Sequence, residues 1–507
     1  MVRLSSLIWN IVILFIIINA SNITEKRRIA FFEKTYAQTK KYEPSWKSLD
    51  SHPLPGWYDD AKYGMFIDWG IYSVPGWAPR VDPKKAKRIE DEAMYPDWYL
   101  REMYIDKDVI EYHKKVWGAE FERDDFIPMF TASKYNPEAL VRTALDAGMK
   151  YIVLFCKHHD GFCLWPCEHT HRDAGEMGPK RDLVKPLIDE CKKAGLKFGF
   201  YFSVEEWEYP VLDETGHTML RLWYPINDKH IFPYREKEME KKISGKIPVG
   251  DFINEYIYPQ AVSFIDKYDP DILWFDGEWS DTEDYYKTKD IVSYFYNNAE
   301  GRKEVVVNDR LGKGNRDVHG DFFTSEYGRG KKKDKNHKWE ENRGISQSFG
   351  YNREDTDENV ITPKQLVDIL VNYVANNGNL LLVVNLDGEG EMPGIYKKRL
   401  KATGDWLKLN GDAIYGTRPC KVPSEGNDIF YTRKNNTVYA ICLNPKKDNI
   451  ILTAVKSSEK TVITLLGSDD ALEWKEENDK LFIEIPQSVK TKKAHQYGYT
   501  IKITNAK

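Results

Sequence analysis

Short apolar runs that end in polar residues alternate along the chain with amphipathic stretches of helical period. The runs read YGMFIDWGIY, KYIVLFCKHH, LKFGFYFSVE, DILWFDGEW, KEVVVNDRL and GDFFTSEYG. Between them, apolar residues recur at helical spacing in 137–147, 183–194, 252–268 and 363–374. Strands that alternate with helices are typical of a parallel β/α architecture, which we predict from about residue 60 to about residue 410.

Two parallel topologies compete for this region, a closed eightfold barrel and an open doubly wound sheet. No G-x-G-x-x-G follows the first strand, so a dinucleotide-binding sheet loses its main support. The barrel is favoured by the polar residues at the carboxyl ends of the strands, because those ends share one rim in a barrel. We therefore predict a (β/α)8-type barrel with one rim that carries Asp68, His158, His159, Tyr201, Asp276, Arg310 and Glu326.

The pattern changes after about residue 415. Short β-rich runs such as DIFYTRKNNTVYAICLNP and YGYTIKITNAK are separated by turn residues and lack helical periodicity. This pattern predicts an antiparallel β-sandwich. The expected organisation is a segment 1–20, a barrel over 45–414 and a sandwich over 415–507.

The first twenty residues have the pattern of a secretory signal. Arg3 precedes an apolar run over 7–18, which is followed by small and polar residues, and we expect cleavage near Ala20. The run is too short for a membrane span, and no later segment is apolar enough to cross a bilayer. The mature protein is expected in the secretory pathway, either secreted or lysosomal, and the sequons at Asn22 and Asn435 then permit N-glycosylation.

The composition adds some information on possible partners and on disulfides. The net charge of −5 gives no electrostatic reason to expect nucleic acid as a partner. Aromatic residues make up 13% of the chain, and although core filling explains most of them, aromatic faces also pack against the apolar faces of sugars. The six cysteines do not reveal a pairing, although Cys163 and Cys167 are close enough to pair if a turn separates them.

The carboxylate of Asp276 emerges from the most apolar run, between Trp274 and Trp279. A carboxylate in such a place is suited to attack on an electrophilic sugar carbon, provided that a second carboxyl group protonates the departing oxygen. Glu278, Glu326 and Glu340 are candidates for that partner. Gly277 ends the strand before Glu278, whereas Glu326 ends a different strand and can approach a bound ring from the other side.

Two adjacent histidines follow the run KYIVLFCK. His158, His159 and Asp160 are all metal-ligand types, but adjacent residues diverge and no further His or Cys has ligand spacing. A neutral imidazole both donates and accepts, which suits a sugar hydroxyl. We therefore predict sugar contact and no metal, with Arg310 and Tyr201 as further hydrogen-bonding groups.

These stretches, together with PDWYLREMY, ISQSFGYN and NNGNLLLVVNLDGEGEMP, resemble in this order the α-L-fucosidases of glycoside hydrolase family 29 over about residues 45 to 418. The resemblance implies a barrel followed by a β-sandwich, no cofactor, and hydrolysis of terminal α-L-fucose with retention from fucosylated glycans or glycoproteins. It implies Asp276 as the nucleophile and Glu326 as the acid/base, with Glu340 as a rival. It also implies fucose contacts from Asp68, Asp97, His158, His159, Tyr201, Trp274 and Arg310.

The chain departs from the family at two of these positions. Asp68 stands where the family usually has His, and Asp97 where it usually has Glu. An ionised Asp accepts hydrogen bonds but cannot donate one, so Asp68 is expected to reverse the polarity of one sugar contact. The departures keep two alternatives open, a catalytically impaired fucose-binding protein and a glycosidase for a related sugar, and whether the protein is a homo-oligomer is left open as well.

Overall fold

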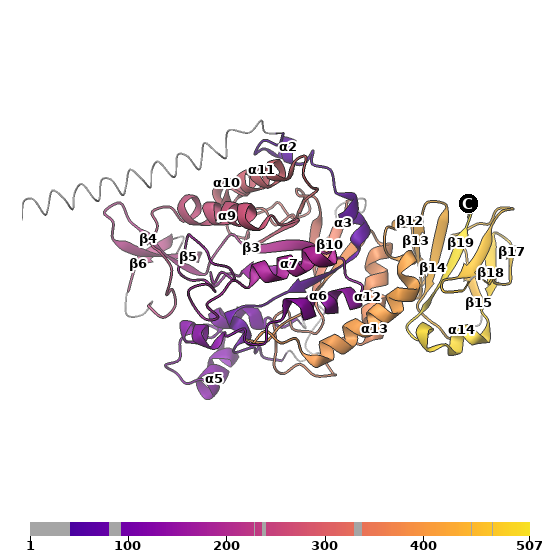
Figure 1. The fold of residues 1–507 in the computed structure, drawn as a ribbon, viewed down its shortest axis with the longest axis horizontal. Helices are drawn as coiled ribbons and strands as arrows, with labels where there is room; N and C mark the ends of the chain where they lie inside the picture. Colours follow the sequence, from indigo (N-terminus) through magenta and orange to yellow (C-terminus); the bar gives the residue numbers. More distant parts are fainter. Residues whose placement is uncertain are drawn as a thin grey trace, which may run out of the picture.

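The computed structural model describes residues 41–80, 93–227, 229–235, 240–328, 337–447, 449–468 and 470–506. It contains a large α/β part and a smaller β part at the C-terminal end (Figure 1). The expected signal segment 1–20 and the sequon at Asn22 lie outside the described residues.

The large part is built on an eight-stranded parallel sheet with the order β8-β7-β3-β2-β1-β11-β10-β9. A parallel bridge between Asn308 and Phe322, just beyond β8 and just before β9, joins the two ends of this order. The predicted (β/α)8-type barrel is thereby confirmed. Its strands are β1 (Tyr63–Ile67), β2 (Tyr151–Lys157), β3 (Lys197–Ser203), β7 (Ile272–Asp276), β8 (Val306–Val307), β9 (Phe323–Glu326), β10 (Trp339–Gly344) and β11 (Gly378–Val383).

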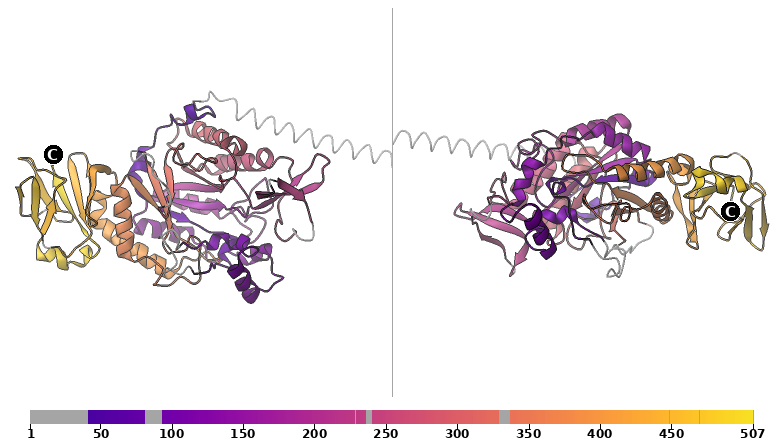
Figure 2. Two further views of the ribbon diagram at one scale, coloured as in Figure 1. Left: turned by 180° about the vertical axis from the view of Figure 1, so that it is seen from behind. Right: turned by 90° about the horizontal axis from the view of Figure 1, so that it is seen from below.

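Helices surround this sheet on its outer side (Figure 2). Local sequence sets their ends: α12 begins after Thr362, whose hydroxyl accepts from the amide of Gln365, and α7 ends at Gly195 in the left-handed conformation. The longer helices are α5 (Lys107–Val116), α6 (Pro137–Asp146), α7 (Val184–Ala194), α9 (Tyr258–Tyr268), α11 (Thr288–Ala299), α12 (Pro363–Ala375) and α13 (Gly394–Asn410). Shorter ones are α2 (Trp46–Leu49), α3 (Gly56–Ala61), α4 (Tyr99–Glu102) and α10 (Glu283–Tyr286).

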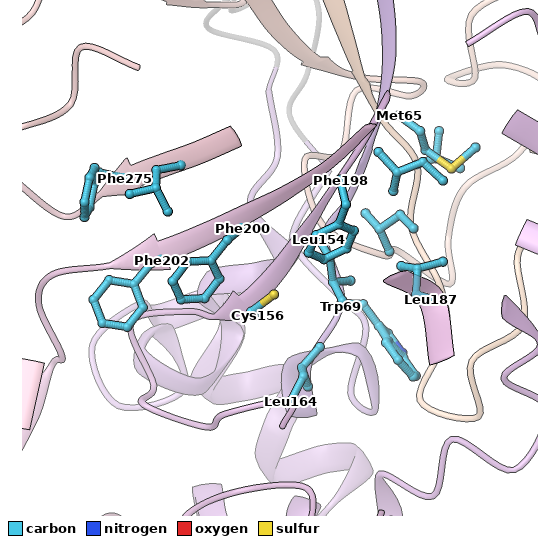
Figure 3. Close-up of a cluster of buried hydrophobic side chains, with 14 of the residues drawn as sticks. Met65, Trp69, Leu154, Cys156, Leu164, Leu187, Phe198, Phe200, Phe202 and Phe275 are labelled. Carbon is cyan, nitrogen blue, oxygen red and sulfur yellow. The ribbon is translucent and has the colours of Figure 1, made fainter. Parts of the chain in front are cut away.

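Both faces of the barrel strands are buried, which is why their sequences read as continuous apolar runs. The outward residues Phe198, Phe200 and Phe202 of β3 belong to the large core cluster, together with Leu187 of α7 (Figure 3). The alternate residues, such as Tyr201 on β3 and Trp274 on β7, form a separate cluster inside the barrel. Because side chains alternate along a strand, Asp276 shares the inner side of β7 with Trp274.

An excursion after β3 was not predicted from the sequence. It forms a three-stranded antiparallel sheet of β4 (Glu208–Leu212), β5 (Thr218–Ile226) and β6 (Lys229–Pro233). This sheet projects from the barrel at the end farthest from the C-terminal part (Figure 1).

The C-terminal part has two antiparallel sheets with a shared apolar core, as predicted for a sandwich. One has the order β12-β13-β14-β19-β16 and the other the order β15-β18-β17. The strands are β12 (Arg418–Glu425), β13 (Ile429–Lys434), β14 (Thr437–Cys442), β15 (Asn449–Leu452), β16 (Val462–Leu465), β17 (Trp474–Glu477), β18 (Lys480–Glu484) and β19 (Tyr499–Thr504), with one short helix α14 (Gln487–Thr491). The sequon residue Asn435 lies exposed between β13 and β14.

Specific contacts attach this part to the barrel. Trp406 of α13 donates its indole N–H to the carbonyl of Gly498 at 2.9 Å, and Arg418 forms an ion pair with Asp60 at 2.7 Å. Among the helices of the described residues, none combines the length and apolarity that a bilayer crossing requires.

Candidate active site

A cavity of about 820 Å³ lies where the carboxyl ends of several barrel strands meet. It is lined by residues of β2, β3, β7 and β9 and by residues of the segments that follow β1, β2, β7, β8 and β10, as expected for a site on the carboxyl rim of a barrel. Seven of the residues singled out in the sequence line it: Asp97, His158, Tyr201, Trp274, Asp276, Arg310 and Glu326. His159 does not line the cavity but lies beside Asp276, and Asp68 lies buried without lining it.

Asp276 at the end of β7 is held by two donors. The Tyr201 hydroxyl donates to Oδ2 at 2.8 Å, and the Arg310 guanidinium donates from Nη1 to Oδ1 at 2.8 Å. Burial alone would raise the pKa of Asp276, but the charge of Arg310 holds that pKa well below its usual range. The carboxylate is therefore ionised at neutral pH.

Glu326 at the end of β9 faces the same cavity. Its Oε2 accepts from Nη2 of Arg310 at 3.2 Å, and its Oε1 accepts from the hydroxyl of Tyr95 at 2.9 Å. Since Arg310 contacts Asp276 and Glu326 with its two terminal nitrogens, one planar group spans both carboxylates. Two acidic residues 50 positions apart in the sequence thus meet at one site.

The other two candidate carboxylates lie elsewhere. Glu340 is buried inside the barrel, where its carboxylate accepts from Trp274 at 3.0 Å, Tyr58 at 2.7 Å and Tyr151 at 2.6 Å. Glu278 is buried and accepts from Nε of Arg316 at 2.5 Å. Neither lines the cavity.

Of the two adjacent histidines, His158 lines the cavity and His159 is buried beside Asp276. Nδ1 of His159 lies 2.6 Å from the Ser203 hydroxyl, which itself donates to the carbonyl of Glu205 at 2.5 Å. His159 is therefore the donor in its contact with Ser203, and its Nε2, 3.8 Å from Asp276 Oδ2, presents a lone pair. Burial lowers the pKa of His159 to about 4, so the ring is neutral at neutral pH.

The second histidine faces Asp97. His158 Nε2 lies 3.7 Å from Asp97 Oδ2, while His158 Nδ1 and Asp97 Oδ1 are buried and find no hydrogen-bond partner among the described residues. Such uncompensated polar atoms in a cavity wall are suited to ligand hydroxyls. Over the described ranges, no group of three or more His, Cys, Asp or Glu has the arrangement of a metal site.

The two departures from the family pattern are buried acids. Oδ1 of Asp68 accepts a hydrogen bond from the Tyr72 hydroxyl, and burial raises the pKa of Asp68 to about 8. Burial likewise raises the pKa of Asp97 well above its usual value. Burial therefore favours the neutral form of both carboxyl groups, and a neutral Asp68, unlike the ionised acceptor expected from the sequence, has a proton to donate.

The sequence reading missed several residues of this site. Tyr95 and Trp98 flank Asp97 and line the cavity, and their closeness to that residue was an available signal. Arg316, from the loop after β8, lines it as well. Nothing in its local sequence marks Arg316, because only the fold brings its loop back over β7.

Cys163 and Cys167 lie close together but form no disulfide. Cys163 and Cys167 are both buried free cysteines, and Nε2 of Gln260 lies 3.1 Å from one sulfur and 3.3 Å from the other.

Comparison with known proteins gives consistent matches. A family model described as alpha-L-fucosidase matches residues 29–412, and one described as alpha-L-fucosidase C-terminal domain matches residues 423–504. The tissue alpha-L-fucosidase of Homo sapiens is 32% identical over 476 residues, which cover 92% of this chain and 93% of the human protein. A putative alpha-L-fucosidase of Caenorhabditis elegans is also 32% identical, over 87% of this chain and 88% of its own length.

Solved structures are similar over most of the chain. The Thermotoga maritima alpha-fucosidase in complex with fucose has a TM-score of 0.73 and 33% identity, covering 91% of this chain and 100% of that chain. The same protein in complex with a mechanism-based inhibitor gives a TM-score of 0.74.

Proposed function

Since this chain belongs to the α-L-fucosidase family, we propose that it is a retaining exo-glycosidase that removes terminal α-L-fucose from glycans by double displacement. Asp276 is the nucleophile and Glu326 the acid/base. The observation that carries this assignment is the Arg310 guanidinium, which bridges the two carboxylates at one cavity.

In the first step, ionised Asp276 attacks the anomeric carbon while a protonated Glu326 gives its proton to the departing oxygen. A low pKa at Asp276 keeps the nucleophile charged without a base to activate it. Tyr201 and Arg310 fix the orientation of the attacking carboxylate by hydrogen bonds to both of its oxygens.

In the second step, Glu326 acts as a base for the water that releases fucose. Once Asp276 has become an ester, it no longer carries a negative charge. The hydrogen bond from Nη2 of Arg310 to Oε2 then keeps Glu326 in place beside the ester, where it takes a proton from the attacking water.

The other residues of the site bind the sugar. Asp97 and His158 line the cavity and bind sugar hydroxyls, with Asp97 Oδ1 and His158 Nδ1 as the unpartnered atoms, and Nε2 of neutral His159 accepts from a hydroxyl placed beside Asp276. Trp274 supplies an apolar face inside the cavity, against which the C6 methyl of fucose packs better than a polar C6 group would. The substrates are fucosylated glycans or glycoproteins, in line with the fucose complex of the Thermotoga maritima relative.

The alternative of a non-catalytic fucose-binding protein gains no support, because both carboxylates face the cavity. The test is to mix purified protein with 4-nitrophenyl α-L-fucoside and to follow nitrophenol release against an Asp276→Ala control. Release that depends on Asp276, with α-L-fucose as the first anomer seen by proton NMR, is the expected result. Wild-type release no faster than that of the Asp276→Ala control would refute hydrolysis, and β-L-fucose as the first product would refute retention.

The secretory route remains part of this proposal. It rests on the apolar run over 7–18 and the small residues after it. N-terminal sequencing of the mature protein from its native cells tests it, with a start near residue 21 as the expected result.

A further inference from the structure

Arg316 occupies a defined place in the cavity although it belongs to none of the family-like motifs. Its Nε donates to Oε1 of buried Glu278 at 2.5 Å, and the backbone amide of the next residue, Asp317, donates to Asp309 at 2.9 Å. The guanidinium and the backbone just after Arg316 are therefore both held by hydrogen bonds, while the side chain is 36% exposed and lines the cavity. Such anchoring suits a group that meets a ligand without reorganising.

The guanidinium of Arg316 has a free donor. Its Nη2 is buried but finds no hydrogen-bond partner in the described part of the chain, and it lies 3.7 Å from Asp276 Oδ1, beyond hydrogen-bond distance. Arg310 differs, because its Nε, Nη1 and Nη2 are used by Thr324, Asp276 and Glu326. An uncompensated buried donor is costly unless a ligand completes it.

The position beside the nucleophile limits what this donor can contact. The departing oxygen leaves from the opposite face of the ring, toward Glu326. Of the two ring atoms bonded to the anomeric carbon, the ring oxygen gains positive charge in the oxocarbenium-like transition state and would be disfavoured beside a guanidinium. The remaining neighbour is the carbon that carries the C2 hydroxyl.

Building on the proposed function, we propose that Arg316 is a further substrate-binding residue whose Nη2 donates a hydrogen bond to the C2 hydroxyl of the fucosyl ring. Glu278 is the positioning residue that holds the guanidinium in place. Hydrogen bonds to the C2 hydroxyl strengthen in the transition state of glycoside hydrolysis. The contact therefore contributes more to kcat than to KM and selects sugars that carry a hydroxyl at C2.

The test compares 4-nitrophenyl α-L-fucoside with its 2-deoxy analogue in wild type, Arg316→Met and Arg316→Lys, with spontaneous hydrolysis subtracted. For Arg316→Met, kcat/KM on the fucoside should fall about 10- to 100-fold, the range of a hydrogen bond from a charged donor, and should change less than about threefold on the 2-deoxy analogue. Arg316→Lys should lie between the two, because a flexible ammonium keeps the charge but not the fork. Arg302→Met removes an exposed Arg that does not line the cavity and serves as the charge-matched control.

Equal losses on both substrates would overturn the inference, because Arg316 would then act through the charge of Asp276 or through the fold. No loss on either would overturn it as well. Calorimetric binding of L-fucose and 2-deoxy-L-fucose gives a readout independent of turnover. If the wild type binds fucose without hydrolysing the fucoside, the proposed activity fails, and the inference stands only if Arg316→Met abolishes the preference for fucose over the 2-deoxy sugar.

Discussion

Glu326 and Glu340 point into the same barrel from neighbouring strands but at different depths. In the pairing of β9 with β10, Glu340 is the register partner of Thr324, and Asn342 is the partner of Glu326. Glu340 therefore lies two residues deeper, beneath Trp274, while Glu326 reaches the cavity. Both residues end apolar runs or follow aromatic ones, and only their register separates a carboxyl group at the rim from one inside the barrel.

Replacement of each glutamate should give opposite phenotypes. Glu326→Ala is expected to lower kcat on fucosyl disaccharides about 10²- to 10⁴-fold, the usual contribution of an acid/base, with activity on 4-nitrophenyl α-L-fucoside restored by azide. Glu340→Gln leaves the hydroxyls of Tyr58 and Tyr151 and the indole of Trp274 competing for one carbonyl oxygen, and should destabilise the fold by about 1–3 kcal/mol without azide rescue. Kinetics with azide and thermal unfolding measure the two effects.

Glu358→Gln, at an exposed position, is the control for the loss of one carboxylate. Azide rescue of a Glu340 variant, with none for Glu326→Ala, would reverse the assignment.

Arg310 should be irreplaceable by lysine. Arg310→Lys keeps one charge but cannot contact Asp276 and Glu326 with two fixed nitrogens, so we expect kcat/KM to fall at least about 100-fold. The pH profile gives the cause: Arg310 holds the pKa of Asp276 low, and the ionised form is the active one. A lysine that contacts Asp276 less closely lets the pKa of Asp276 rise, so the acid limb of kcat/KM should move to higher pH. An unmoved acid limb would contradict the role given to the guanidinium.

The contribution of Tyr95 to the rate should be larger for substrates whose leaving group needs a proton. Its hydroxyl donates to Oε1 of Glu326 and fixes the carboxyl group, so Tyr95→Phe should slow hydrolysis of a fucosyl disaccharide about 3- to 10-fold, the cost of one hydrogen bond. The 2,4-dinitrophenyl fucoside, whose leaving group needs no proton, should be affected less. Equal effects on both substrates would place Tyr95 in sugar binding instead.

The parts of the site that could be predicted from the sequence are those that a short stretch of residues determines by itself. A buried run that stops at Asp276 or His158 marks a strand end, and the barrel then requires these ends to share one rim. The choice between Glu326 and Glu340 depends on the register between two strands, which neither strand encodes alone. The protonation of Asp68 depends on burial by residues from several elements, so an isolated Asp in the sequence was read with its usual charge.

Two features of the structure were not predicted from the sequence, and the physical reasons differ. The stretch 218–226 reads TMLRLWYPI, a short run rich in apolar and aromatic residues, which is a strand signal that was available although the excursion of β4, β5 and β6 was not predicted. Arg316 had no such signal, because an arginine in a polar loop is ordinarily a solvated side chain. Its role depends on Glu278, which the fold places beside it.

Asp68 should make stability depend on pH in a defined direction. The pKa of its carboxyl group is raised to about 8 in the folded protein, so the stability of the neutral form is complete below the unfolded pKa of about 4 and is lost as pH rises toward 8. Asp68→Asn keeps an oxygen to accept from Tyr72 but does not titrate. The difference in Tm between this variant and wild type should therefore grow in favour of the variant from pH 4.5 to 8.5, whereas exposed Asp357→Asn should show no such trend. A constant difference would mean that Asp68 is ionised in the fold.

Gly277 follows the nucleophile Asp276 and lies close to Ser203, the hydrogen-bond partner of His159. Its replacement should therefore lower both stability and activity, and a control glycine distinguishes the two effects. Gly277 has φ +85°, and a Cβ there would lie 2.7 Å from the Ser203 hydroxyl that fixes Nδ1 of His159. Gly277→Ala should therefore lose roughly 1–2 kcal/mol of stability from the left-handed backbone and also lower kcat/KM, because Ser203 must shift. Gly301→Ala isolates the first effect, since Gly301 has φ +70° and no atom within 4 Å of its added Cβ. Thermal unfolding and fucoside kinetics should show both variants destabilised and only Gly277→Ala impaired in turnover. Equal turnover in the two would mean that the Ser203 contact with His159 does not matter for the reaction.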